Sequence, residues 1–212
     1  TFNDEYSVVI EGTGNEATLN GGTYENIQVK TTEDQANTLT ITGGEYKDIV
    51  GDDNGGSPKK DQTTVKGGTF KNSVKQFADN TLAYELNDSG TYSYHKTVDE
   101  ALEAATSSEA TITNISEAET PVTYYEVIVN YGNSQGTVTE YIKANTQYKL
   151  PSAPSSRPGY TFDGWLIYGN RYQPGATITI DGPKTIDADW NEVSSSDSGP
   201  ATYSPTLDVS DG

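Results

Sequence analysis

A double glycine that occurs three times constrains the fold of this chain more than any other feature. The copies are Gly21-Gly22, Gly43-Gly44 and Gly67-Gly68, and their first glycines lie 22 and 24 residues apart. In each copy an aliphatic residue precedes the pair by two positions, and an aromatic residue follows the first glycine by three. A period in the twenties with β-forming residues is typical of a solenoid, in which each repeat stacks on its neighbours.

The middle copy shows how one repeat would fold. Leu39 and Ile41 alternate with threonines, so a strand here points its aliphatic side chains inward. Glycine reaches positive φ at no steric cost, so Gly43-Gly44 predicts a sharp corner after this strand. We expect Tyr46 to stack on its counterparts in the neighbouring repeats. The pattern predicts a mainly all-β chain that begins with a short right-handed parallel β-helix.

A glycine pair can also belong to a phosphate-binding loop. Such a loop needs a helix N-terminus directly after the glycines and commonly a Lys-Ser/Thr pair. Here a further β-like stretch follows each pair, and the pair recurs three times. These observations argue against a nucleotide site.

The last copy continues into "TVKGGTFKNSVKQFADNTLAYELNDSGTYSYH". This segment resembles one found in large surface proteins of gut Firmicutes, where a β-helical "GGTF" repeat ends in a hairpin. The resemblance covers residues 38–95 and implies that the stack ends near Val74. It also implies a hairpin of Thr81–Leu86 and Thr91–His95, with a turn at Asn87–Gly90.

A single clear helix signal follows the hairpin. In "TVDEALEAATS" Thr97 is the expected N-cap, and Glu100 is its capping-box partner three residues later. We expect this helix, together with the hairpin, to cap the open edge of the stack. A further strand is expected at Ala110–Ser116. The first domain is thus predicted to span residues 1–120.

Residues 121–191 form a second predicted module, which is less acidic and richer in aromatic residues. Alternating residues at Glu126–Tyr131 and Thr137–Ile142 flank "GNSQG" and predict a hairpin. "LPSAPSSRPGYTFDGW", "YQPGATITI" and "TIDADW" then resemble the Listeria–Bacteroides repeat, related to the B repeat of internalins. The resemblance implies a small β-grasp-like domain that serves bacterial surface proteins as a spacer or interaction module.

Local signals in this module predict its strands. Pro158-Gly159 and Pro174-Gly175 each predict a turn. Strict alternation from Tyr160 places Phe162 on one face of a strand and Trp165 on the other. We expect Trp165 and Trp190 in the core.

Composition narrows the range of functions. The net charge is −18, and residues 1–120 hold 21 acidic and 8 basic side chains. This negative field repels phosphate backbones, so we expect no nucleic-acid partner. The chain has no Cys, which excludes disulfides and thiolate sites, and no apolar stretch long enough to span a bilayer. We expect a monomer.

An enzyme is the first alternative, since parallel β-helices also host polysaccharide lyases. Asp52, Asp53 and Asn54 form an acidic loop beside a repeat, either a weak candidate Ca²⁺ site or a solvated turn. Apart from that weak calcium candidate we expect no cofactor. Both arginines lie in the second module, and His95 is the sole histidine. Three short repeats offer little cleft for paired carboxylates, so we expect no catalytic residues.

Carbohydrate binding is the second alternative. Tyr160, Trp165, Tyr168 and Tyr172 lie close in sequence, and aromatic faces stack on sugars as well as on one another. The competing interpretation is that Trp165 is a core residue covered by the tyrosines.

Residues 192–212 are rich in serine and lack apolar periodicity, so we expect a flexible linker. Together the two resemblances imply a fragment of an extracellular, wall-attached bacterial surface protein. The expected function is structural and adhesive, presenting or spacing a binding surface toward host, matrix or polysaccharide.

Overall fold

The computed structural model describes residues 8–30, 37–51, 62–117 and 120–193. Strands dominate these ranges, where α1 (Val98–Ala104) is the only α-helix and η1 (Lys75–Phe77) is a short 3-10 turn. The chain divides into two compact units. The first unit holds residues 1–128, 139–148 and 177–184, and the second holds 129–138, 149–176 and 185–212. The first unit therefore takes in segments from beyond residue 121.

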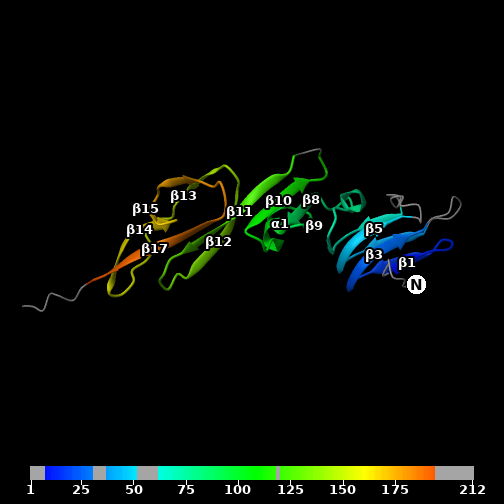
Figure 1. Ribbon diagram of the computed structural model, residues 1–212, viewed down its shortest axis with the longest axis horizontal. Coiled ribbons are helices and arrows are strands. Elements are labelled where there is room, and N and C mark those ends of the chain that lie inside the picture. Colours follow the sequence, from blue (N-terminus) through cyan, green and yellow to red (C-terminus); the bar gives the residue numbers. More distant parts are fainter. Residues whose placement is uncertain (1–7, 31–36, 52–61, 118–119, 194–212) are drawn as a thin grey trace, which may run out of the picture. The chain divides into compact units, whose positions relative to one another are not determined.

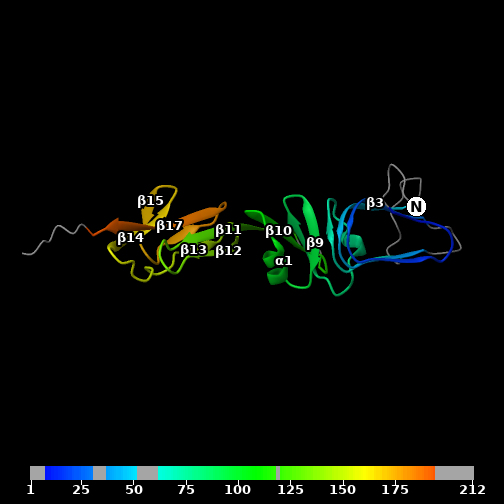
Figure 2. The same cartoon turned by 90° about the horizontal axis from the view of Figure 1, so that it is seen from below.

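Two sheets of parallel strands form the stack in the first unit. One sheet contains β1 (Val8–Ile10), β3 (Thr23–Val29), β5 (Glu45–Val50) and β7 (Thr69–Phe70), in that order (Figure 1). The other contains β2 (Glu16–Leu19), β4 (Thr38–Ile41) and β6 (Thr63–Val65). Figure 2 shows these two layers on opposite sides of the first unit's core.

The register of the stack follows the period of the double glycine. Thr18 lies opposite Thr40, 22 residues later, and Thr40 lies opposite Thr64, 24 residues later. The strands β3, β5 and β7 keep the same two offsets. Each repeat therefore contributes one strand to each sheet. The parallel arrangement inferred from the repeat is confirmed.

The two glycines of each pair have different roles. Gly22, Gly44 and Gly68 have φ values of 100°, 111° and 98°, which supply the corner between the layers. The first glycine of the later pairs instead lies against the previous repeat. A Cβ on Gly43 would lie 2.9 Å from the Asn20 carbonyl oxygen, and a Cβ on Gly67 would lie 2.5 Å from that of Thr42.

An aromatic ladder runs through the core of the stack. The rings of Tyr24 and Tyr46 stack at 5.3 Å and 6°, and those of Tyr46 and Phe70 at 5.3 Å and 21°. Burial, with the neighbouring Tyr24, raises the pKa of Tyr46 to about 12. The expected stacking of equivalent aromatic residues is confirmed. One strand of the stack, β1, has no double glycine and was not foreseen from the sequence.

A hairpin covers the exposed edge of the last parallel strand. β9 (Thr91–His95) pairs antiparallel with both β7 and β8 (Tyr84–Asp88), and Phe70 lies opposite Tyr92. The predicted hairpin is confirmed, with β8 starting at Tyr84 rather than Thr81. Its two turn residues, Ser89 and Gly90, have φ values of 52° and 83°, as a type I′ turn requires.

The helix α1 follows the hairpin at the expected position. The Thr97 side chain accepts from the Glu100 N–H, and the Glu100 carboxylate accepts from Lys96 N at 2.9 Å. The helix packs on a cluster that contains Leu86 and Ile112, rather than on the edge of the stack. β9 pairs with the edge strand β7 of one sheet, and Ala78 bridges Val65 of the edge strand β6 in the other. The hairpin of the predicted cap therefore lies at the edge of the stack, while α1 packs on the hairpin sheet. β10 (Glu109–Asn114) pairs with β8 and with β11 (Val122–Asn130).

Three antiparallel strands organise the second unit. β14 (Tyr160–Ile167) lies between β15 (Asn170–Tyr172) and β17 (Lys184–Glu192). Gly159 and Gly175 have φ values of 80° and 76°, and each Pro-Gly pair lies inside a hydrogen-bonded turn, as predicted. The predicted hairpin is also present, since β12 (Thr137–Lys143) pairs with β11. β13 (Gln147–Lys149) and β16 (Thr177–Thr179) form a separate two-stranded sheet, and all of their residues except Lys149 belong to the first unit.

A β-bulge overturns the predicted alternation in β14. Phe162 lies opposite Trp190 and Gly164 opposite Asp189, so Asp163 is an extra residue. The extra residue brings Phe162 and Trp165 into contact, with ring centroids 5.3 Å apart, although strict alternation places them on opposite faces. Trp165 is fully buried, as expected of a core residue, whereas Trp190 is only half-buried.

Within the described ranges, no helix is long and apolar enough to span a bilayer. The predicted linker lies outside the described residues from residue 194 onward.

Candidate binding surfaces

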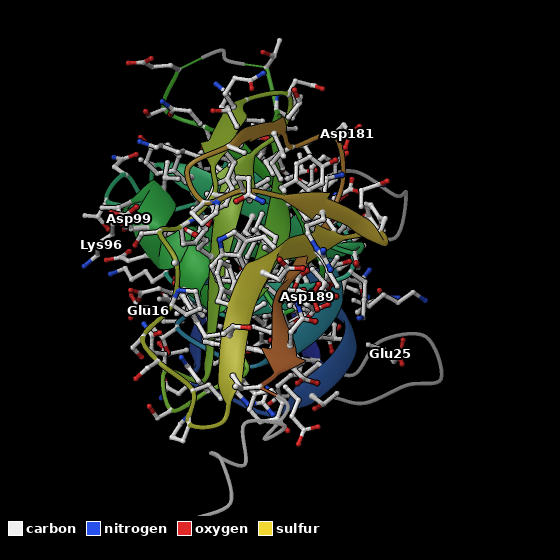
Figure 3. The ribbon with its side chains drawn as sticks, turned by 90° about the vertical axis from the view of Figure 1, so that its left-hand side faces the viewer. Glu16, Glu25, Lys96, Asp99, Asp181 and Asp189 are labelled. Carbon is white, nitrogen blue, oxygen red and sulfur yellow. The ribbon has the colours of Figure 1, made fainter. Side chains whose placement is uncertain are left out.

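A shallow groove crosses the parallel strands on their outer face and is here called the rung groove. It holds about 430 Å³ and is lined by Thr23–Glu25, Glu45–Lys47, Thr69–Lys71 and Thr91. Glu25 and Lys47 occupy equivalent positions of successive repeats, and Lys47 Nζ lies 3.8 Å from Glu25 Oε2. Lys71, at the next equivalent position, donates from Nζ to Thr91 Oγ1 of the hairpin at 3.1 Å. Figure 3 shows Glu25 of β3 on one side of the first unit and Glu16 of β2 on the other.

A second groove lies on the sheet of β8, β9 and β10 and is here called the Glu85 groove. It holds about 530 Å³. Its strand residues are Glu85, Asn87, Tyr92, Thr111 and Thr113. Ser73, Lys75, Gln76 and Pro121 form its sides.

Strand register explains why these polar side chains share one face. Asn87 lies opposite both Tyr92 and Thr111, and Thr113 lies opposite Glu85. Alternation turns Leu86 and Ile112 to the opposite face, where they form the apolar cluster with α1. The helix thus covers one side of this sheet, and the polar groove lies on the other.

Glu85 is the most buried of the groove's charged side chains, with 6% of its surface exposed. Its Oε2 accepts hydrogen bonds from Ser73 Oγ and from the Tyr94 hydroxyl, the latter at 2.9 Å. The Tyr94 oxygen in turn accepts from Val74 N at 2.6 Å. Among the described residues, no donor contacts Oε1. One oxygen of a buried carboxylate is therefore left with free acceptor capacity.

Burial and the nearby Glu85 carboxylate both raise the pKa of Tyr94. The phenol therefore stays protonated at neutral pH and can donate to Glu85. Tyr94 lies on β9 and Ser73 lies just before η1, and their two hydrogen bonds to Oε2 orient the carboxylate.

A further hollow of about 390 Å³ adjoins the Glu85 groove and shares Asn87 and Thr111 with it. Its other lining residues include Ser89, Ser107 and Glu109. The two hollows are neighbours along β8 and β10.

The structure does not gather the aromatic residues predicted for carbohydrate binding into one platform. Trp165 is fully buried, and its N–H donates to the Pro151 carbonyl oxygen at 3.1 Å, so its ring faces are not available to a ligand. Tyr172 lies opposite Trp165 and is half-buried. Tyr160 and Tyr168 lie at opposite ends of β14, roughly 25 Å apart at the usual rise per residue.

The two terminal tyrosines differ in their surroundings. The guanidinium of Arg157 lies over the Tyr160 ring, 4.0 Å from its centroid. Tyr168 is 74% exposed at the tip of the β14–β15 hairpin, with φ at 49°. Of the four tyrosine and tryptophan residues predicted for sugar binding, Tyr168 is the most exposed.

The remaining predicted positions bring no further site together. Asp52, Asp53 and Asn54 lie outside the described residues. In the described part of the chain, no group of three or more His, Cys, Asp or Glu side chains is placed to hold a metal ion. His95 Nε2 lies 2.8 Å from Ser93 Oγ, and burial lowers the pKa of His95 against the opposing effect of Glu100. Neither Ser93 nor His95 lines the cavities described above.

The two arginines are engaged within the second unit. Arg171 forms ion pairs with Asp163 and Asp189, which lie on neighbouring strands. Asp163 is the bulge residue of β14, so this ion pair accompanies the irregularity that places Trp165. Both arginines therefore have structural contacts.

No family model and no curated protein matches this sequence. The two family resemblances accordingly stay predictions.

Proposed function

We propose that this chain is a non-catalytic structural and adhesive module of a bacterial cell-surface protein, located extracellularly or in the cell wall. It presents or spaces a binding surface toward host, matrix or polysaccharide. In finer terms, we propose that the parallel stack is a short right-handed β-helix. The second unit, in this proposal, is a β-grasp-like domain of the Listeria–Bacteroides repeat type.

The observation that carries the proposal is the rung groove on an in-register stack. Neighbouring strands lie about 4.8 Å apart, so a polymer laid along the stack meets equivalent side chains at each step. The paired groups of this groove, such as Lys47 with Glu25, present both charges and hydroxyls to such a polymer. The absence of Cys and the net charge of −18 are compatible with an exported, soluble surface module.

Retention of the purified chain on immobilised polymers tests the proposal. The polymers are cell-wall peptidoglycan, neutral plant polysaccharides, pectin and collagen, and the same samples are assayed for unsaturated products by ultraviolet absorbance. We expect retention on at least one polymer without product. Replacing Lys47 and Lys71 together by alanine is expected to weaken retention severalfold, whereas Lys149→Ala in the second unit leaves it unchanged.

Two results would count against this function. Unsaturated products from an acidic polysaccharide would establish the lyase alternative. No retention on any polymer would remove the adhesive role.

Carbohydrate binding through the second unit is the other candidate, and the exposed ring of Tyr168 is the observation that favours it. Tyr168→Ala is expected to weaken retention on polysaccharide in that case, with unchanged thermal unfolding. Tyr160→Ala is the comparison variant, because the Tyr160 ring is already covered by Arg157.

A further inference from the structure

We propose that the Glu85 groove is a binding site for a neutral saccharide of one or two hexose rings. The inference rests on the proposed adhesive role and names a ligand class for a site that the sequence did not suggest. It starts from the buried Glu85 carboxylate, in which Oε2 is held by Ser73 and Tyr94 while Oε1 has no donor among the described residues. A carboxylate oxygen with free acceptor capacity at a groove wall can accept a hydrogen bond from a ligand that enters the groove.

A sugar hydroxyl meets this requirement without adding charge. Hydrogen bonds to an ionised carboxylate are about twice as strong as those between neutral groups. Glu85 is also preorganised, since two hydroxyl donors fix its orientation before any ligand arrives. The ligand therefore does not have to order this side chain.

The rest of the groove offers groups that complement a polyhydroxylated ring. Lys75 and Gln76 supply amino and amide donors at one side, and neither side chain has a hydrogen-bond or ion-pair partner among the described residues. Thr111 and Thr113 supply hydroxyls from β10. Tyr92 adds an aromatic ring, which is half-buried at the floor. Hydroxyl groups both donate and accept, so a sugar can satisfy all of these groups together.

Size and charge narrow the ligand further. A volume of about 530 Å³ lies within the usual range for small-ligand sites, and the adjoining hollow extends it along β8 and β10. The Glu85 groove is lined by the Glu85 carboxylate and the Lys75 ammonium, and the neighbouring hollow adds the Glu109 carboxylate. Together with the net charge of −18, this excess of negative charge disfavours uronic acids and sulfated sugars.

The test measures the binding of defined disaccharides to the whole chain in solution. Cellobiose, maltose, lactose and N,N′-diacetylchitobiose are the neutral probes, and digalacturonic acid is the anionic one. Saturation-transfer NMR detects binding and calorimetry gives the Kd. We expect at least one neutral disaccharide to bind and digalacturonic acid not to bind.

Variants then assign the binding to the groove. Glu85→Gln is expected to raise the Kd about tenfold or more, since it removes the charged acceptor. Because this change also alters the contacts to Ser73 and Tyr94, the exposed residues are replaced separately: Gln76→Ala and Lys75→Ala are each expected to raise the Kd about threefold, with unchanged thermal unfolding. Glu16→Gln, on the β2 face, is the matched control and is expected to leave the Kd unchanged.

The inference fails if no neutral disaccharide binds, if digalacturonic acid binds more tightly than all of them, or if the three groove variants bind like the wild type. If Glu85→Gln leaves the Kd of every neutral disaccharide unchanged while the chain is still retained on a polymer through Lys47 and Lys71, the groove assignment is overturned and the proposed adhesive function stands. If the chain is retained on no polymer, the proposed adhesive function fails instead. The disaccharide measurement in solution then still shows whether the Glu85 groove binds a saccharide.

Discussion

The two units bury their aromatic side chains in different ways. In the first unit, Tyr24, Tyr46 and Phe70 come from equivalent positions of successive repeats and stack nearly parallel. In the second unit, the buried ring of Trp165 has edge-on contacts with both Tyr131 and Phe162. The first arrangement is a ladder built from one repeated position, and the second is a cluster around a single residue.

This difference reflects how each unit defines its register. In the stack, every step reuses the same local pattern, so the offset between strands equals the repeat period. In the second unit, one extra residue at Asp163 moves Trp165 onto the face of Phe162. A ladder therefore tolerates change at its ends, whereas a cluster depends on its central residue.

The largest expected loss of stability comes from removing Trp165, the central residue of the cluster. Trp165→Ala is expected to lower the free energy of unfolding by about 3–5 kcal/mol, because it leaves a large cavity and an unpaired Pro151 carbonyl. Tyr24→Ala, at the end of the ladder, should cost only about 1–2 kcal/mol, because this ring is half-buried and stacks on one described neighbour. Urea unfolding followed by circular dichroism measures both. Equal losses would contradict the contrast between ladder and cluster.

A smaller difference in stability is expected between alanine variants of two glycines that occupy the same position of the repeat, Gly67 and Gly21. A Cβ on Gly67 would lie 2.5 Å from the Thr42 carbonyl oxygen, while no described atom lies within 4 Å of a Cβ on Gly21. Gly67→Ala is expected to cost about 2–3 kcal/mol, because backbone must move to admit the methyl group. Gly21→Ala should change stability by less than about 0.5 kcal/mol. Thermal unfolding of the two variants checks this. If Gly21→Ala loses as much stability as Gly67→Ala, close approach of the previous repeat does not explain why glycine occupies this position.

The smallest expected effect depends on pH and concerns the turn after α1. The Asp88 carboxylate accepts hydrogen bonds from Thr106 N and Oγ1, both at 2.8 Å, and from Ser107 N at 3.1 Å. Partial burial acts to raise the pKa of Asp88, but the hydrogen bonds from Ser107 and Thr106 outweigh it and hold the pKa below its ordinary value. A lowered folded-state pKa stabilises the fold above the unfolded pKa of about 3.9, and this contribution is lost as the pH falls through the folded value.

Asp88→Asn is therefore expected to lower stability by about 1 kcal/mol at pH 7 and to have less effect in strong acid. Denaturant titrations of the variant and the wild type at both pH values measure the gap. If the difference in unfolding free energy between the variant and the wild type stays constant from pH 7 into strong acid, the ionised Asp88 carboxylate is not the source of the stabilisation.

Local signals predicted much of this fold. The double glycines, the hairpin turn at Ser89-Gly90 and the N-cap Thr97 each depend on residues close in sequence, and each is found where expected. β1 was missed because it joins the stack without a glycine pair. The predicted face of Trp165 was wrong because period-two alternation cannot reveal a β-bulge, and the bulge depends on the pairing of β14 with β17.

The Glu85 groove could not be read from the sequence in the same way. Its lining residues come from Ser73, from Lys75 and Gln76 of η1, and from three strands, which only the register brings together. One signal was available: Glu85 and Asn87 alternate with Leu86 in a strand whose apolar side faces α1. That alternation indicates a polar face, but it does not show that the carboxylate on this face is buried.

Cysteine pairs test the central claim that the spacing of the double glycines sets the register of the stack. The chain has no natural cysteine, and Thr18 and Thr40 lie directly opposite each other on β2 and β4. Adjacent strands lie about 4.8 Å apart, within the Cα distance that a disulfide spans. Mass spectrometry after mild oxidation should show efficient disulfide formation in Thr18→Cys/Thr40→Cys. It should show little in Thr18→Cys/Thr42→Cys, which is shifted by two residues. Preferential cross-linking of the shifted pair, or of neither pair, would contradict the stacked register.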